Sequence, residues 1–189
     1  MTLKQTASQT IGPFFSYCLT PESFGHQGIA GPSLLRPGLA GEKIRIAGQL
    51  FDGANAPVAD ALIEIWQADF QGKYPTNATA NGFSGFGRAA TNASGQFLFE
   101  TVKPGAVPGR GNVWQAPHIG IIILARGMLT HLYTRLYFDD EAEANAQDPV
   151  LSRVPAGRRG TLIAKRDSEG AYRFDIRLQG DNETAFFDV

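Results

Sequence analysis

The sequence predicts a mainly β protein: an antiparallel β-sandwich core with a long N-terminal arm and short peripheral helices. Several short segments alternate apolar with polar residues and are separated by turn residues, which is typical of sandwiches. The 189 residues include 22 glycines and 11 prolines, enough for many tight turns. A hydrophobic content of 43% at this length supports one domain with its own core.

The first 41 residues form the arm, which is rich in glycine and proline and shows no regular apolar period. A segment of this length without periodicity must pack either on its own domain or on a partner chain. Within it, Gly12-Pro13 makes a rigid corner of the backbone, which is either a plain turn or one wall of a ligand pocket.

The strands are expected to follow the arm in order. Ile44, Ile46 and Leu50 alternate with polar or small residues after Lys43. The pattern predicts strands over 43–50, 61–67, 96–102, 118–126, 130–138 and 172–178, and a last edge strand over 184–188. A short helix over 141–146 is expected to be capped by Asp139 or Asp140 and stopped before Pro149.

Composition argues against several classes of function. The net charge of −1 gives no basic surface for nucleic acid or anionic membranes. No apolar run approaches the roughly 20 residues that span a bilayer, and the first residues lack the apolar core of a signal peptide. The single Cys18 cannot form an internal disulfide. We therefore expect a cytoplasmic protein.

Candidate metal ligands are few, because the histidines are His26, His118 and His131 alone. His118 begins a predicted strand, and residues i and i+2 of a strand share a face. Position 120 is glycine, so this face presents one imidazole and an empty space. Tyr74 follows a glycine turn and is either a phenolate ligand or a packing residue. These residues predict no transition-metal site held by this chain alone.

Arg135 is the strongest candidate for binding a ligand. In the strand over 130–138, His131, Tyr133, Arg135 and Tyr137 are expected on one face, which is aromatic and cationic. A guanidinium can grip a carboxylate through two hydrogen bonds. The alternative is a solvated or ion-paired arginine, and the residues alone do not separate the two.

Seven short motifs, in a fixed order along nearly the whole chain, resemble those of the intradiol ring-cleavage dioxygenases. They are Ser8–Phe14, Gly48–Gly53, Leu62–Asp69, Val102–Gly105, Ala116–Ile119, Thr134–Glu141 and Tyr172–Gly180. The resemblance implies a β-sandwich and a non-haem Fe(III) site made of two tyrosines and two histidines. The matching positions here are Tyr74, Val107, His118 and Gly120, so two of the four ligands are missing. We expect these positions to be vestigial, with no metal and no catalytic residue in this chain.

The resemblance is greatest to the iron-free α subunit of the two-chain members of this family, in which an iron-bearing β subunit of similar fold is the partner. It implies that Fe(III) is bound by that β subunit, that the arm (residues 1–41) packs on the partner, and that residues 42–189 form the sandwich domain. It also implies that Thr10, Gly12, Pro13 and Arg135 line the substrate pocket. The implied reaction is intradiol cleavage of 3,4-dihydroxybenzoate by O₂ to 3-carboxy-cis,cis-muconate. The alternative is a non-catalytic, transthyretin-like sandwich that binds a small ligand, because fold does not fix function.

Overall fold

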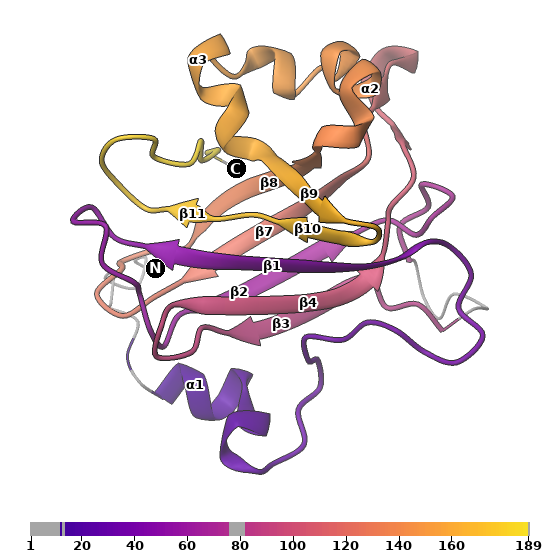
Figure 1. The fold of residues 1–189 in the computed structure, drawn as a ribbon. Coiled ribbons are helices and arrows are strands. Elements are labelled where there is room, and N and C mark those ends of the chain that lie inside the picture. Colours follow the sequence, from indigo (N-terminus) through magenta and orange to yellow (C-terminus); the bar gives the residue numbers. More distant parts are fainter. Residues whose placement is uncertain (1–11, 13, 76–81, 189) are drawn as a thin grey trace, which may run out of the picture.

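The computed structural model describes residue 12 and residues 14–75 and 82–188. Within these ranges, eleven strands form the body of the molecule, with short helices at its periphery (Figure 1). The strands are β1 (Lys43–Phe51), β2 (Leu62–Gln67), β3 (Phe86–Ala90), β4 (Gln96–Val102), β5 (Val107–Pro108), β6 (Trp114–Gln115), β7 (His118–Leu124), β8 (Leu132–Phe138), β9 (Ile163–Ser168), β10 (Ala171–Arg173) and β11 (Ile176–Arg177). The helices are α1 (Phe14–Leu19), α2 (Ala142–Gln147) and α3 (Ala156–Arg159), and the 3₁₀ turns are η1 (Pro21–Phe24), η2 (Arg110–Asn112), η3 (Asp139–Glu141), η4 (Leu151–Arg153) and η5 (Gly160–Leu162).

Two layers of strands face one another across the core, which confirms the predicted β-sandwich. One layer contains β4, β1, β10 and β11, the other contains β3, β2, β7 and β8, and β9 joins them. Most pairs are antiparallel, but β1 runs parallel to β10 and β11, and β8 runs parallel to β9. The sequence did not indicate these parallel pairs, because strand direction depends on the connections between strands rather than on residue pattern.

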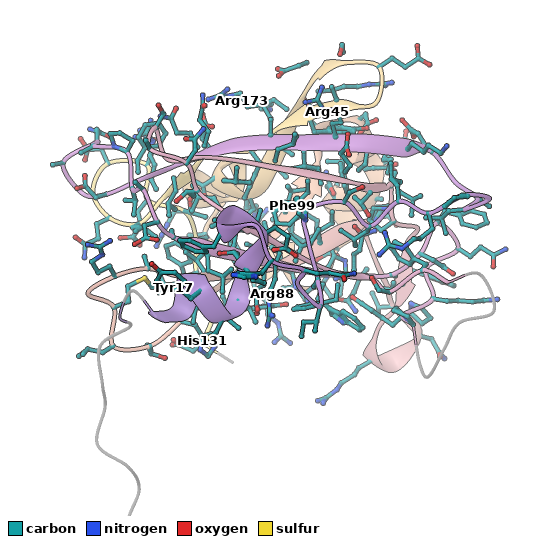
Figure 2. The ribbon with its side chains drawn as sticks, turned by 90° about the horizontal axis from the view of Figure 1, so that it is seen from below. Tyr17, Arg45, Arg88, Phe99, His131 and Arg173 are labelled. Atoms are coloured by element: carbon teal, nitrogen blue, oxygen red, sulfur yellow. The ribbon has the colours of Figure 1, made fainter. Side chains whose placement is uncertain are left out.

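The core fills the space between the layers with side chains from alternate strand positions. Figure 2 shows Phe99 inside the molecule, whereas Arg45 and Arg173 lie on its outer surface. The most buried strand residues include Ile44, Ile46, Leu50, Ile63, Ile65, Phe99, Ile119, Ile121, Ile123, Leu136 and Phe138. This inward set leaves the opposite faces of β7 and β8 free to carry polar groups.

The last part of the arm packs on its own sandwich. Leu34 and Leu39 belong to the core cluster. The backbone N–H of Leu34 donates to the carbonyl of Glu100 in β4 at 2.8 Å, and the N–H of Arg88 in β3 donates to Gly31 at 3.0 Å. Residues 31–41 are therefore part of the folded domain, and packing on a partner stays a prediction for the residues before them.

The helix α1 lies below β3 in Figure 1, whereas α2 and α3 gather at the opposite end of the sandwich, beyond β8 and β9. A second apolar cluster lies beneath them and includes Tyr137, Leu151, Val154 and Leu162. No helix in the described ranges is long and apolar enough to cross a membrane.

Three local predictions were wrong. The strand expected over 172–178 is interrupted, because the Asp175 carboxylate accepts the backbone N–H of Gln49 at 3.0 Å in place of a ladder bond. The edge strand expected over 184–188 is reduced to a single bridge between Phe187 and Tyr133. Neither Asp139 nor Asp140 caps a helix; the Asp139 carboxylate accepts the N–H of Arg166 at 3.1 Å instead.

Candidate functional site

Two of the four positions that were expected to be vestigial, His118 and Gly120, lie on the outer face of the β2–β7–β8 sheet. His118 and Gly120 are two residues apart on β7 and share this face. In the antiparallel ladder, His118 lies opposite Tyr137, and Gly120 lies between Arg135 on β8 and Trp66 on β2. The register therefore brings the predicted cation, Arg135, directly beside the position that lacks an imidazole.

Tyr74 and His118, two of the positions expected to be vestigial, contact each other. The Tyr74 hydroxyl lies 3.3 Å from Nε2 of His118. The carbonyl of Ala116 lies 2.7 Å from Nδ1 and can only accept, so Nδ1 carries the proton and Nε2 accepts from Tyr74. The Tyr74 ring also stacks on Trp66, with ring centroids 5.8 Å apart. Both polar groups are thereby satisfied within this chain.

Both groups are held in their neutral forms. Burial is the largest influence on His118, followed by the positive charge of Arg135, and together they lower its pKa to about 4. Burial likewise raises the pKa of the Tyr74 phenol above its ordinary value, although Arg135 opposes this shift. In this structure the pair is therefore a neutral phenol that donates a hydrogen bond to a neutral imidazole.

The other two positions offer no ligand. Val107 is 3% exposed in the β5–β6 hairpin and has only an aliphatic side chain. A Cβ atom at Gly120 would lie 3.1 Å from the Tyr133 hydroxyl and 3.4 Å from the Trp66 carbonyl. The space for a second imidazole is thus partly taken by Tyr133. No group of three or more His, Cys, Asp or Glu side chains that could hold a metal occurs in the part of the chain described, and the residues at this site do not fit Fe(III).

Arg135 is half-buried among neutral partners. Its Nη1 donates to Oε1 of Gln115 at 2.7 Å. Burial disfavours its charge, but the phenols of Tyr137 and Tyr133 outweigh this effect and raise the pKa of the guanidinium. Within the described ranges, none of the ion pairs closer than 4.0 Å includes Arg135. The site therefore carries a positive charge without a directly paired carboxylate.

Asp148 supports this site by accepting hydrogen bonds from residues around it. It is fully buried and accepts from the Tyr137 hydroxyl at 3.1 Å and from the backbone N–H of Ala116 at 2.8 Å. Two further N–H groups, those of Val150 and Leu151, also donate to it at 2.9 and 2.7 Å. Asp148 thus fixes Ala116, whose carbonyl orients the His118 ring.

The sequence pattern did not indicate a role for Gln115 or Asp148. It correctly placed Tyr133, Arg135 and Tyr137 on one face of β8. His131 was expected to share that face, but it precedes β8 and is exposed at the edge of the molecule (Figure 2). Of the predicted pocket residues in the arm, Thr10 and Pro13 lie outside the described residues. Gly12 is described, and nothing lies within 4 Å of a Cβ atom placed there.

Comparison with known proteins identifies the family. The family model described as "Dioxygenase" matches residues 36–180, and the chain is 47% identical over 199 residues to the protocatechuate 3,4-dioxygenase alpha chain of Burkholderia cepacia, covering 100% of this chain and 99% of that one. The chain belongs to the intradiol dioxygenase family. Members of this family are non-haem iron enzymes.

This intradiol dioxygenase chain is also similar to the protocatechuate 3,4-dioxygenase beta chain of Burkholderia cepacia. The identity is 33% over 159 residues, covering 76% of this chain and 67% of that one. Among solved structures, 3-chlorocatechol 1,2-dioxygenase from Rhodococcus opacus 1CP superposes with a TM-score of 0.62 at 22% identity, over 87% of this chain and 80% of that one. That likeness shows a shared β-sandwich fold.

Proposed function

We propose that this chain is the α subunit of a protocatechuate 3,4-dioxygenase and that it acts together with a homologous β subunit. The observation that carries the proposal is the incomplete ligand set. Two of its four positions, Val107 and Gly120, have no donor, and the other two satisfy each other. The similarity to an alpha chain over its whole length supports the same assignment.

In this proposal Fe(III) belongs to the β subunit, which would carry the two tyrosines and two histidines of the complete site. The assembly cleaves the ring of 3,4-dihydroxybenzoate between its two hydroxyl-bearing carbons, with O₂, to give 3-carboxy-cis,cis-muconate. This chain supplies part of the cavity wall, excludes water and orients the substrate.

Thr10, Gly12 and Pro13 are the proposed wall residues. Gly12 supports this role because none of the described residues lies within 4 Å of a Cβ atom placed there. A methyl group at position 12 would therefore meet none of the described residues, and it would be felt by a ligand or partner that approaches closely.

Arg135 is the proposed electrostatic guide or clamp for the substrate carboxylate. Its described partners are neutral, so its positive charge remains available to an anion. A partly buried charge is screened less by salt than an exposed one, which strengthens its effect on a ligand.

Co-expression with a candidate β subunit tests the assignment. We expect the purified complex to contain iron and to consume O₂ with 3,4-dihydroxybenzoate, whereas this chain purified alone has neither property. Stoichiometric ferric iron with a tyrosinate colour in the single chain would overturn the proposal.

Two variants of the complex test the pocket residues. Arg135→Ala should raise KM for 3,4-dihydroxybenzoate more than for catechol, which lacks the carboxylate, and equal effects would remove Arg135 as a carboxylate partner. Gly12→Ala should raise KM, whereas the matched change Gly157→Ala, at another glycine with open space around it, should not. Unchanged kinetics in Gly12→Ala would place the corner away from the substrate.

A further inference from the structure

The former metal position is filled rather than left empty. Arg135 lies directly opposite Gly120 in the β7–β8 ladder, so its side chain projects from the same face as a residue-120 side chain would. The Tyr133 hydroxyl occupies the space next to Gly120, 3.1 Å from where a Cβ atom would lie. Two side chains of β8 therefore converge on the place where the second imidazole is missing.

The charge of the Arg135 guanidinium also acts on Tyr74 and His118, the two positions that keep a possible ligand. After burial, the positive charge of Arg135 is the next largest influence on the pKa of both Tyr74 and His118, and it lowers both. A charge acts on two groups in this way only when it lies close to both. Arg135 thus lies opposite Gly120 in the ladder, and its positive charge acts on both Tyr74 and His118.

The chemistry of this cation is complementary to its surroundings. A guanidinium presents five N–H donors in one plane. The groups around it are acceptors: Oε1 of Gln115 at 2.7 Å, and the phenol oxygens of Tyr133 and Tyr137, which raise the pKa of Arg135. Tyr137 in turn donates to Asp148 at 3.1 Å, which leaves its oxygen free to accept from Arg135.

We propose that the Arg135 guanidinium, with the Tyr133 hydroxyl, takes the place of the lost metal ion: it organises the vestigial ligand residues and excludes a metal cation. Arg135 is then a positioning residue for Tyr137, Gln115 and the Tyr74–His118 pair. The inference rests on the proposed function in that iron is assigned to the partner. It goes beyond that function by explaining what stabilises this face of the chain without iron.

Restoring one ligand tests the exclusion. In the full chain, Gly120→His re-creates a His-x-His pair beside Tyr74, and Co²⁺ is the probe, followed by calorimetric titration and visible absorption. We expect Gly120→His alone to bind Co²⁺ weakly, and Gly120→His/Arg135→Met to bind at least tenfold more tightly. The matched control Gly120→His/Lys103→Met removes a different cation and should give no gain. Equal affinity with and without Arg135 would overturn the proposal.

A second measurement does not depend on the folding of the histidine variants. Arg135→Ala leaves a hole of guanidinium shape, so millimolar guanidinium should raise its melting temperature relative to NaCl at the same ionic strength. The control Arg166→Ala, at a more exposed arginine, should show no such rescue. The absence of rescue in Arg135→Ala would contradict the organising role. The unaltered chain is measured in parallel, and iron bound there would refute the proposed function instead, so the two failures are distinguishable.

Discussion

Two partly buried cations of this sandwich differ in how their charge is balanced. Lys103 contacts Asp140 at 2.9 Å and Glu141 at 2.8 Å, and Asp140 also accepts from the Tyr172 hydroxyl at 2.8 Å. Arg135 instead has neutral partners, and Tyr137 stands between it and Asp148. A directly paired cation stabilises the fold and has little left to offer a ligand. A cation among neutral acceptors keeps a charge that an anionic ligand could use.

The largest expected effect is the pH dependence of stability that comes from His118, the neutral histidine near Arg135. The pKa of His118 is about 4 in the folded chain, against an ordinary value of about 6.5. Above pH 6.5 the imidazole is neutral in both states, and its contribution to stability is fully present. As the pH falls from 6.5 towards 4, the unfolded chain binds a proton that the folded chain does not. The free energy of unfolding should therefore fall by an amount on the order of 3 kcal/mol.

Urea unfolding of the full chain and of His118→Gln between pH 7 and pH 4 measures this contribution. The variant should lose less stability over this range than the unaltered chain. Parallel losses in the two proteins would show that His118 titrates normally.

The next largest effect should come from the paired cation. Lys103→Met removes the cation that pairs with Glu141 and leaves Asp140 with the Tyr172 hydroxyl and Arg166 at 3.6 Å. We expect a loss of about 2 kcal/mol in the free energy of unfolding. The control is Lys165→Met, at an exposed lysine of β9, which should change stability little. Equal losses at both positions would mean that the Lys103 cluster is no more important than the surface.

Arg135→Met should cost less than Lys103→Met, about 1 kcal/mol. It strands no carboxylate, and relief from burying a charge offsets part of the lost hydrogen bonding. Denaturation midpoints of the two variants at pH 7 give the comparison directly. A larger loss for Arg135→Met than for Lys103→Met would reverse the distinction between the two cations.

The smallest effect is expected from Tyr74→Phe. It removes one long hydrogen bond to His118 but keeps the stacking on Trp66, so the cost should be about 0.5 kcal/mol. Tyr17→Phe is the control, because Tyr17 is 59% exposed. A loss well above 1 kcal/mol would indicate that the pair is more than a remnant.

Sequence pattern predicted the strands whose two faces differ clearly in polarity, such as β1, β2, β4, β7 and β8. It missed β3, with the sequence Phe-Gly-Arg-Ala-Ala, because that strand has no β-branched residues. It also missed β9, which ends in exposed charged residues. In each case pairing with neighbouring strands decides the conformation, and such long-range contacts leave no local signal.

For the candidate site, too, the sequence predicted local features but not long-range contacts. The two-residue period of a strand placed His118 and Gly120 on one face of β7. It likewise placed Tyr133, Arg135 and Tyr137 on one face of β8. It could not place these two sets side by side, because that depends on the β7–β8 register. The role of Asp148 could not be predicted from the sequence. This residue lies in the turn after α2, and no sequence period links that turn to the sheet.

The burial of Leu34 and Leu39 has a practical consequence for dissecting subunit assembly. Deleting residues 1–41 would remove two core residues together with the arm. A measured loss of affinity for a partner could then result from unfolding rather than from the missing arm. A cut just before Gly31 would spare both leucines and the backbone bond from Arg88. A loss of partner affinity after that shorter deletion would then report on residues 1–30 rather than on damage to the core.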